Sequence, residues 1–364
     1  ANLLVKGHGS GLVVNLIVGS FLFLLIWVNL DNIFSLMPGS YSDGRYVFLF
    51  LGLARVMDMY SGLNGTILVT SKKYRYDFTF SLMLVALTVA SNALLIPRWG
   101  MTGAALATII SQGISVLLCA GYLGTHGFIF DFKPSSFKIH GDKVKLLIKI
   151  GLPSSVQSFV TNLSFLMMTA IVNGFGVAAS AAVAVCGKFN SFGIMPALAM
   201  SSSVSSLAAQ NIGAGKYDRA VEALKVGLKI SVVIGIAVFA FTQLCPQLIL
   251  EMFNAEPAVI DYGVTYLRAF CFDYLIVPFV FCINGLMLGA GHSMFSLVNN
   301  MLSAILLRVP VAYFVSKTSL GLAGVGAAAP AASLASLIVG VWFLLSGRWK
   351  KNSTGIHRRG AAEA

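Results

Sequence analysis

Long apolar segments alternate with short polar ones along nearly the whole chain. A helix that crosses a bilayer needs about 20 mostly apolar residues, and about ten segments reach that length. They are residues 10–37, 46–69, 77–97, 101–123, 146–174, 178–209, 226–250, 260–289, 293–316 and 321–346. In lipid every backbone polar group must be bonded within the protein, which favours helices. The pattern therefore predicts an all-α integral membrane protein with about ten transmembrane helices.

Two neighbouring helices, 146–174 and 178–209, carry more polar side chains than an anchor needs. These are Gln157, Thr161, Asn162 and Ser164 on the first, with Lys188 and Asn190 on the second. Each helix also contains a proline, Pro153 or Pro196, which membrane helices tolerate where protein or water satisfies the freed backbone groups. We expect the polar set to line a cavity, with helix–helix hydrogen bonding as the alternative. For Lys188 the alternatives are contact with an anionic group and snorkelling along its stem.

Composition agrees with a membrane protein. The chain is 57% hydrophobic and 10% charged, against about 25% charged in soluble domains. Its net charge of +12 does not indicate nucleic acid, because the basic residues lie in loops between apolar spans. Most of them lie on one side, and by the positive-inside rule both termini are cytoplasmic. We expect a multi-pass protein of the cell membrane, the inner membrane of a bacterium.

No motif for a cofactor, a metal or a nucleotide stands out. The five cysteines lie in apolar stretches without CxxC spacing, and the histidines have no ligand spacing. The sequence contains no GxxxxGK[ST] motif for ATP. We expect no cofactor and no ATP, with transport driven by an ion gradient or by the gradient of the substrate.

Charged residues within apolar spans are the strongest functional candidates, because an unpaired charge in a membrane is costly. Asp273 lies close to Pro278 in LRAFCFDYLIVPFVFCING, where it could bind and release H⁺ or Na⁺. The alternative is pairing with Arg268 or capping of a broken helix. In the first half of the chain, Arg55 and Asp58 are three residues apart on one helix face, which favours a structural ion pair.

Other polar residues are cavity candidates of lower weight. These are Asn284, Asn299, Asn300 and Arg308. For the serines between 201 and 206 we favour tight packing over ligand contact.

The first and last helices of the chain look alike. SGLNGTIL at 61–68 matches FCINGLML at 281–288, and WGMTGAALAT at 99–108 matches LGLAGVGAAA at 320–329 at nearly the same offset. The pattern predicts two lobes related by an axis along the membrane normal. The expected domains are a partial first lobe 1–123, a cytoplasmic linker 124–144, a complete second lobe 145–346 and a basic tail 347–364.

Several segments of the second half resemble the MATE (multidrug and toxic compound extrusion) transporters. They are IGLPSSVQS, AAVAVCGKFNSF, AAQNIGAGKYDRA, YLRAF and CINGLMLGAGH. The resemblance implies a twelve-helix fold of which this chain's first lobe lacks two helices. It also implies export of amphipathic, cationic organic compounds by antiport with H⁺ or Na⁺ as the two lobes alternate in access.

Residues 1–110 look more like the C-terminal half of a polysaccharide flippase of the same superfamily. NLDNIFSLMP and GLARVMDMYSGLNGTILVTSKKYRYD carry that likeness. Two alternatives to drug export therefore remain at this point. One is a flippase for a lipid-linked oligosaccharide, and the other is a non-transporting truncated or fused membrane fragment.

Overall fold

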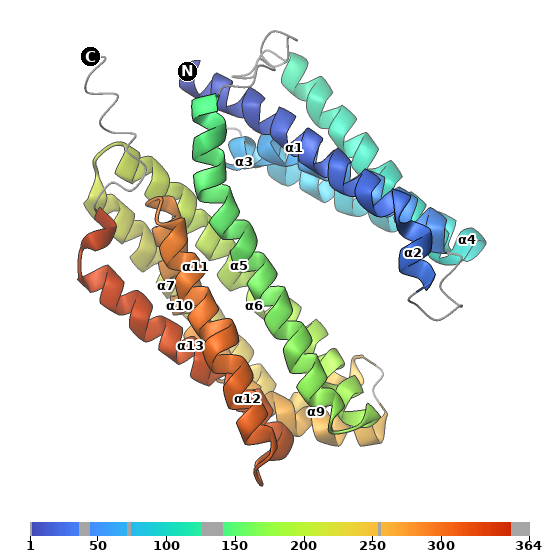
Figure 1. Cartoon of the computed structure of the whole chain (residues 1–364), viewed down its shortest axis with the longest axis vertical. Coiled ribbons are helices and arrows are strands. Elements are labelled where there is room, and N and C mark those ends of the chain that lie inside the picture. Colours follow the sequence, from blue (N-terminus) through green and yellow to red (C-terminus); the bar gives the residue numbers. More distant parts are fainter. Residues whose placement is uncertain (1, 36–43, 71–73, 126–140, 254–255, 351–364) are drawn as a thin grey trace. The chain divides into compact units, whose positions relative to one another are not determined.

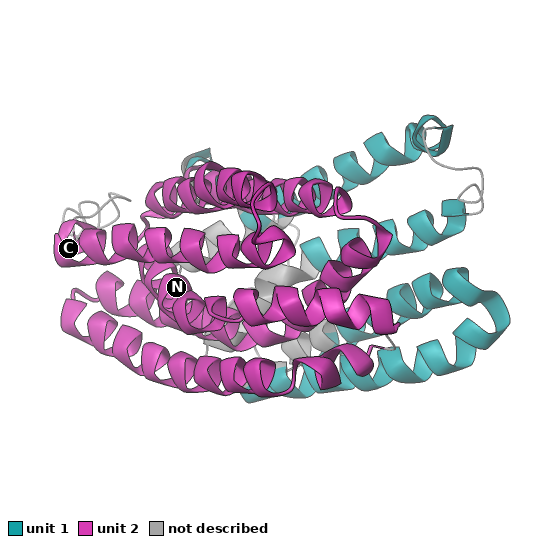
Figure 2. Cartoon of the chain, turned by 90° about the horizontal axis from the view of Figure 1, so that it is seen from below, with its two compact units in different colours: residues 1–148 teal, residues 149–364 magenta. Residues whose placement is uncertain are grey.

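The computed structural model describes residues 2–35, 44–70, 74–125, 141–253 and 256–350, and it places nearly all of them in helices (Figure 1). No β-strand occurs in these ranges. Contacts divide the chain into two compact units, residues 1–148 and 149–364, coloured separately in Figure 2. Most of the predicted linker and of the predicted tail lies outside the described residues.

The first unit contains α1 (Asn2–Val28), α2 (Leu30–Ser35), α3 (Arg45–Thr70) and α4 (Tyr74–Thr125). Helix α3 packs against both α1 and α4. Between α1 and α3 the rings of Phe23, Trp27 and Phe48 stack with centroids 6.1 to 6.4 Å apart. Large aromatic faces thus replace the hydrophobic effect, which is weak between helices in lipid.

Helix α4 covers two of the predicted spans and bends between them. A straight helix of its 52 residues would be about 78 Å long, more than twice the apolar thickness of a bilayer. Pro97 removes a backbone donor, and Gly100 leaves the helical conformation with φ 53° and ψ −130°. The chain reverses there, as Figure 1 shows, so the predicted spans 77–97 and 101–123 are separate arms of a hairpin.

The second unit holds the longer series of helices, which begins with α5 at the boundary of the units. They are α5 (Gly141–Asn173), α6 (Val177–Gly213), α7 (Tyr217–Leu244), α8 (Pro246–Glu251), α9 (Pro257–Phe270), α10 (Asp273–Gly289), α11 (Ser293–Met301), the π-helix η3 (Leu302–Leu307), α12 (Arg308–Ser316), α13 (Gly321–Leu345) and the short η4 (Arg348–Lys350). Helix α10 is central, because it packs on α6, α7 and α13.

Close backbone approach holds α10 against α6. A Cβ at Gly285 would collide with the Ser201 carbonyl, so only glycine allows this packing. The Ser201 hydroxyl donates to the Phe281 carbonyl at 2.7 Å. The prediction that the serines between 201 and 206 serve in tight packing is therefore confirmed for Ser201.

The outer faces of the helices are apolar. Phe159, Phe21 and Ile338 are each more than 60% exposed, which fits contact with lipid rather than water. In the described residues, six helices are long and apolar enough to cross a membrane, and α9 with α10 makes a seventh as a bent pair. The prediction of an all-α membrane protein is confirmed. Every predicted span lies on helices, whereas the count of ten stays a prediction.

Candidate polar site in the second unit

The span formed by α9 and α10 is broken by a bend of 50°. At the bend the Tyr274 amide bonds the Cys271 carbonyl at 3.0 Å, in the tighter i to i+3 pattern. Pro278 has no amide hydrogen, so the normal helical partner of the Tyr274 carbonyl is missing. This interruption places polar groups of the backbone beside the first residue of α10, Asp273.

Asp273 is 6% exposed, and its Oδ1 atom has no hydrogen-bond partner among the described residues. It stands in the first turn of α10, where the helix dipole favours a carboxylate. Its interactions are with the Ser333 hydroxyl of α13 and, through charge, with Arg308 of α12. A carboxylate with one free oxygen in a buried position can accept a proton or a small cation.

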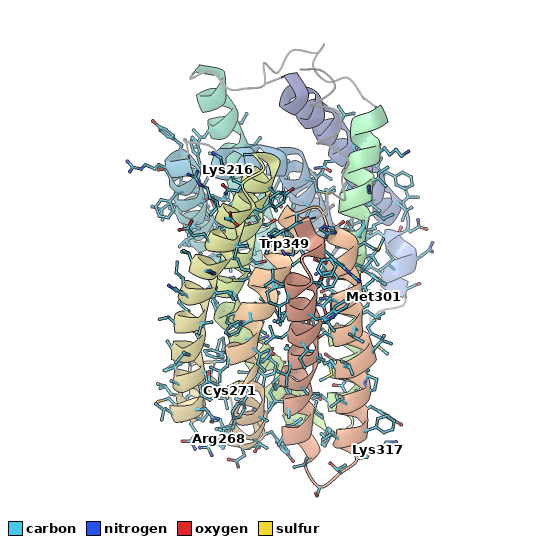
Figure 3. All side chains as sticks on the ribbon, turned by 90° about the vertical axis from the view of Figure 1, so that its left-hand side faces the viewer. Lys216, Arg268, Cys271, Met301, Lys317 and Trp349 are labelled. Carbon is cyan, nitrogen blue, oxygen red and sulfur yellow. The ribbon has the colours of Figure 1, made fainter. Side chains whose placement is uncertain are left out.

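The alternative prediction that Asp273 forms an ion pair with Arg268 is wrong. Within the described part of the chain no ion pair joins the two, and Arg268 is exposed in the last turn of α9. In Figure 3, Arg268 and Lys317 lie at one end of this unit and Lys216 lies at the other. Arg268 is five residues before Asp273, a spacing that does not place two side chains on one helix face, and the bend between α9 and α10 lies between them.

Arg308 reaches the site from an irregular helix. The π-helix η3 adds a residue to the turn just before it, and Pro310 two residues later removes a backbone donor. The hydroxyl of Ser164 on α5 donates to the Ala304 carbonyl in this segment, and the Ser303 hydroxyl donates to the Ala332 carbonyl at 3.0 Å. These bonds fix the segment that carries Arg308 between α5 and α13.

The guanidinium of Arg308 is half-buried. It lies over the ring of Phe165 with 4.8 Å to the centroid, and it interacts with the Tyr266 hydroxyl. Its Nε atom is buried without a hydrogen-bond partner in the described residues. Because Asp273 is not within ion-pair distance of Arg308, the buried carboxylate and the half-buried guanidinium are near each other but do not neutralise each other by contact.

A cavity of about 200 Å³ lies between α5, α6, α9 and α12. Arg308 and Asn190 line it together with the aromatic rings of Phe165, Tyr266 and Phe270. Asn173 and Ser180 close one side and bond each other at 2.9 Å. Of the candidates taken from the sequence, Asn190 and Arg308 are thus brought to one cavity.

The other candidates on α5 and α6 lie elsewhere. The Thr161 hydroxyl is 2.9 Å from the Gln157 carbonyl and 3.1 Å from Oδ1 of Asn300 on α11, so it joins two helices. Asn162 is exposed and donates to the Ser158 carbonyl. Lys188 is exposed on the surface of α6. None of these residues lines the cavity between α5 and α9.

Two candidate asparagines are buried in the interior of the unit. Asn299 is 2% exposed and donates to the Ser336 carbonyl at 3.3 Å, and Asn284 is 7% exposed. The Oδ1 atoms of both have no partner among the described residues. They lie on α10 and α11, and neither lines the cavity.

In the first unit, the Arg55 guanidinium lies 3.7 Å from the Asp58 carboxylate. The side chains are 83% and 53% exposed, and Gln112 of α4 also donates to Asp58, at 3.1 Å. Exposed pairs of this kind contribute little to stability.

Sequence reasoning missed Tyr266, Phe165 and Ser333. Tyr266 is seven residues before Asp273, which places both on one side of a continuous helix, so its spacing could have indicated it. Phe165 and Ser333 give no such signal, because their relation to Arg308 and Asp273 exists only across packed helices.

Comparison with known proteins indicates which family part of the chain resembles. Residues 153–314 match the MatE family model. The probable multidrug resistance protein YpnP of Bacillus subtilis is 28% identical over 280 residues, which are 75% of this chain and 62% of that protein. The second half of the chain is thus similar to MATE transporters.

Other comparisons agree. The probable multidrug resistance protein NorM of Thermotoga maritima is 25% identical over 269 residues, 71% of this chain and 55% of that protein. A solved MOP superfamily transporter from Pyrococcus furiosus superposes with a TM-score of 0.87 at 20% identity, covering 96% of this chain and 84% of that one. That likeness shows the fold. The chain spans less than two thirds of the length of these two multidrug resistance proteins.

Proposed function

We propose that this chain acts as a secondary transporter of the MATE type that exports amphipathic organic compounds, cationic ones among them, in exchange for H⁺ or Na⁺. The observation that supports the proposal is Asp273, a buried carboxylate with a free oxygen at a break in a membrane helix. Charged groups at such depth are rare unless they serve a function. Alternating access of the two lobes would expose the site to each side in turn.

The coupling step follows from charge. A proton or Na⁺ on Asp273 removes the attraction between its carboxylate and Arg308, so the packing of α10 against α13 differs between the loaded and empty states. An ion that changes this packing can shift the balance between two conformations of the lobe. The energy of the ion gradient is thereby transmitted to the substrate.

The experiment measures uptake of a fluorescent organic cation by proteoliposomes that contain the full chain. An imposed pH or Na⁺ gradient is expected to drive uptake, and the gradient that works identifies the ion. Uptake that is the same with and without any gradient would contradict exchange. Absence of uptake under all conditions would support the non-transporting alternative.

A flippase for a lipid-linked oligosaccharide is favoured less. A pyrophosphate group requires several cations in one cavity, yet Arg55 and Lys188 are exposed, and Arg308 is the charged residue in the cavity lining that the structure describes. The same proteoliposomes test this alternative with a labelled polyprenyl-pyrophosphate sugar, which we expect to stay in its leaflet.

We also propose that both termini face the cytoplasm. The loop at Lys216 and the segment at Trp349 lie toward the same end of the second unit, opposite to Lys317 (Figure 3). In cells, a membrane-impermeant maleimide added outside is expected to modify Lys317→Cys and to leave Lys216→Cys unmodified until the membrane is opened. The reverse labelling pattern would place the termini outside.

A further inference from the structure

The cavity between α5, α6, α9 and α12 offers binding chemistry beyond the ion coupling proposed for Asp273, and it shares Arg308 with that step. We infer that it binds a small planar aromatic compound carrying a carboxylate, with Arg308 as the residue that recognises the anion. This inference rests on the proposed export of amphipathic compounds and extends it to aromatic carboxylates as a substrate class.

The walls of the cavity suit a flat aromatic ring. Phe165 from α5 and both Tyr266 and Phe270 from α9 contribute aromatic surface. Rings prefer stacked or edge-to-face neighbours of this kind. The volume of about 200 Å³ is below the roughly 300–1,000 Å³ of sites for drug-sized ligands. A compound of one or two fused rings therefore fits better than a large amphiphile.

The charge of the cavity selects an anion. Among the described lining residues, Arg308 alone is charged, and no acidic residue lines the cavity with it. Its Nε atom has no hydrogen-bond partner in the part of the chain that the structure describes. A carboxylate matches the planar fork of donors that a guanidinium presents, and such bonds are strong where water is excluded.

Aromatic cavities often bind cations, but in this cavity a side chain of the protein already occupies the position of the cation. The face of Phe165 is already covered by the guanidinium of Arg308, with 4.8 Å to the ring centroid. A second cation beside it would meet like charge in a medium of low dielectric. The aromatic cage thus holds a tethered cation of its own, which leaves an anion as the complementary ligand.

The test compares three probes of the same shape on the purified full chain in nanodiscs: 2-naphthoate, 2-naphthamide and 2-naphthylmethylamine. Equilibrium dialysis is expected to show 2-naphthoate binding at least about tenfold more tightly than the other two. Equal or tighter binding of the amide or the amine would overturn the inference.

Variants then locate the effect. Arg308→Gln is expected to weaken 2-naphthoate by about tenfold or more while changing 2-naphthamide by less than about threefold. Asn190→Asp places a negative charge in the same cavity, so it is expected to weaken 2-naphthoate and strengthen the amine even if Arg308→Gln fails to fold. Arg268→Gln, on the exposed face of α9, is the matched control and should change none of the three.

The outcomes separate this inference from the proposed function. The binding assay contains no gradient, so loss of coupled transport with intact selectivity for 2-naphthoate would refute only the coupling proposal. Coupled transport of the organic cation without selectivity for 2-naphthoate would refute only the anion site. Arg308→Gln that weakens all three probes equally would show a structural role instead.

Discussion

Each half of the chain pairs an aspartate with an arginine, and the two pairs differ in every physical respect. Arg55 and Asp58 lie on one helix, 3.7 Å apart, with most of both side chains exposed. Asp273 and Arg308 come from two helices, and they interact through charge without an ion-pair contact; Asp273 is buried and Arg308 is half-buried. An exposed pair is screened and contributes little. A buried and incompletely neutralised pair is costly, so a protein keeps it for a reason other than stability.

The largest expected difference between the pairs is in transport. Asp273→Asn keeps the size of the side chain but removes its titratable charge, so gradient-driven uptake should fall by about tenfold or more. Asp58→Asn should retain most of the uptake, because its carboxylate is solvated and already shared with Gln112. Proteoliposome uptake rates under one imposed gradient measure both.

The matched control for this experiment is Asp261→Asn, which alters an exposed aspartate on α9. It should transport as the parent chain does. If Asp58→Asn abolishes uptake and Asp273→Asn does not, the coupling site lies in the first unit and the comparison is reversed.

Stability gives the second difference. Arg308→Gln leaves the Asp273 carboxylate without its nearby cation, so the variant should lose about 2 kcal/mol or more of stability. Arg55→Gln should change stability by less than about 0.5 kcal/mol. Thermal unfolding in detergent, followed by the loss of monodisperse protein, ranks the two variants.

The double variant Asp273→Asn with Arg308→Gln sharpens this test. It should recover part of the stability lost in Arg308→Gln, because no buried charge is left without compensation. A double variant that is less stable than both single variants would show that the two residues do not interact.

The smallest expected effect concerns two glycines, one in each unit, that the internal repeat aligns. Gly100 in α4 and Gly321 at the start of α13 have φ of 53° and 49°, and each precedes a glycine three residues later, Gly103 or Gly324. Side chains with a Cβ are strained at such φ values by about 1–2 kcal/mol. Alanine at either position should therefore lower stability by a similar, modest amount, measured by the same thermal unfolding.

A neutral result at one glycine and a large loss at the other would indicate that the two positions are not equivalent. The positive φ that both glycines share supports the internal repeat, while the superposition of the two lobes stays a prediction.

Local features of the sequence determined the class and the helices. The apolar runs predicted helices where the structure has them, because lipid leaves the backbone no other way to satisfy its polar groups. Pro97 with Gly100, and the segment around Pro278, marked the places where helices bend, since proline removes a donor wherever it occurs. The spacing of Arg55 and Asp58 likewise placed them on one helix face, because that relation is local.

The site was decided by tertiary packing. The sequence singled out Asp273, Asn190 and Arg308 one at a time, but it offered Arg268 as the partner of Asp273, and the fold supplies Arg308 and Ser333 instead. The π-helix η3 was not predicted from the sequence. It directly precedes Arg308, whose guanidinium lies over the ring of Phe165 and lines the cavity. Sequence fixes which side chains a helix carries, whereas the neighbours of a buried charge depend on how separate helices rotate and approach, and that is settled only when they pack together.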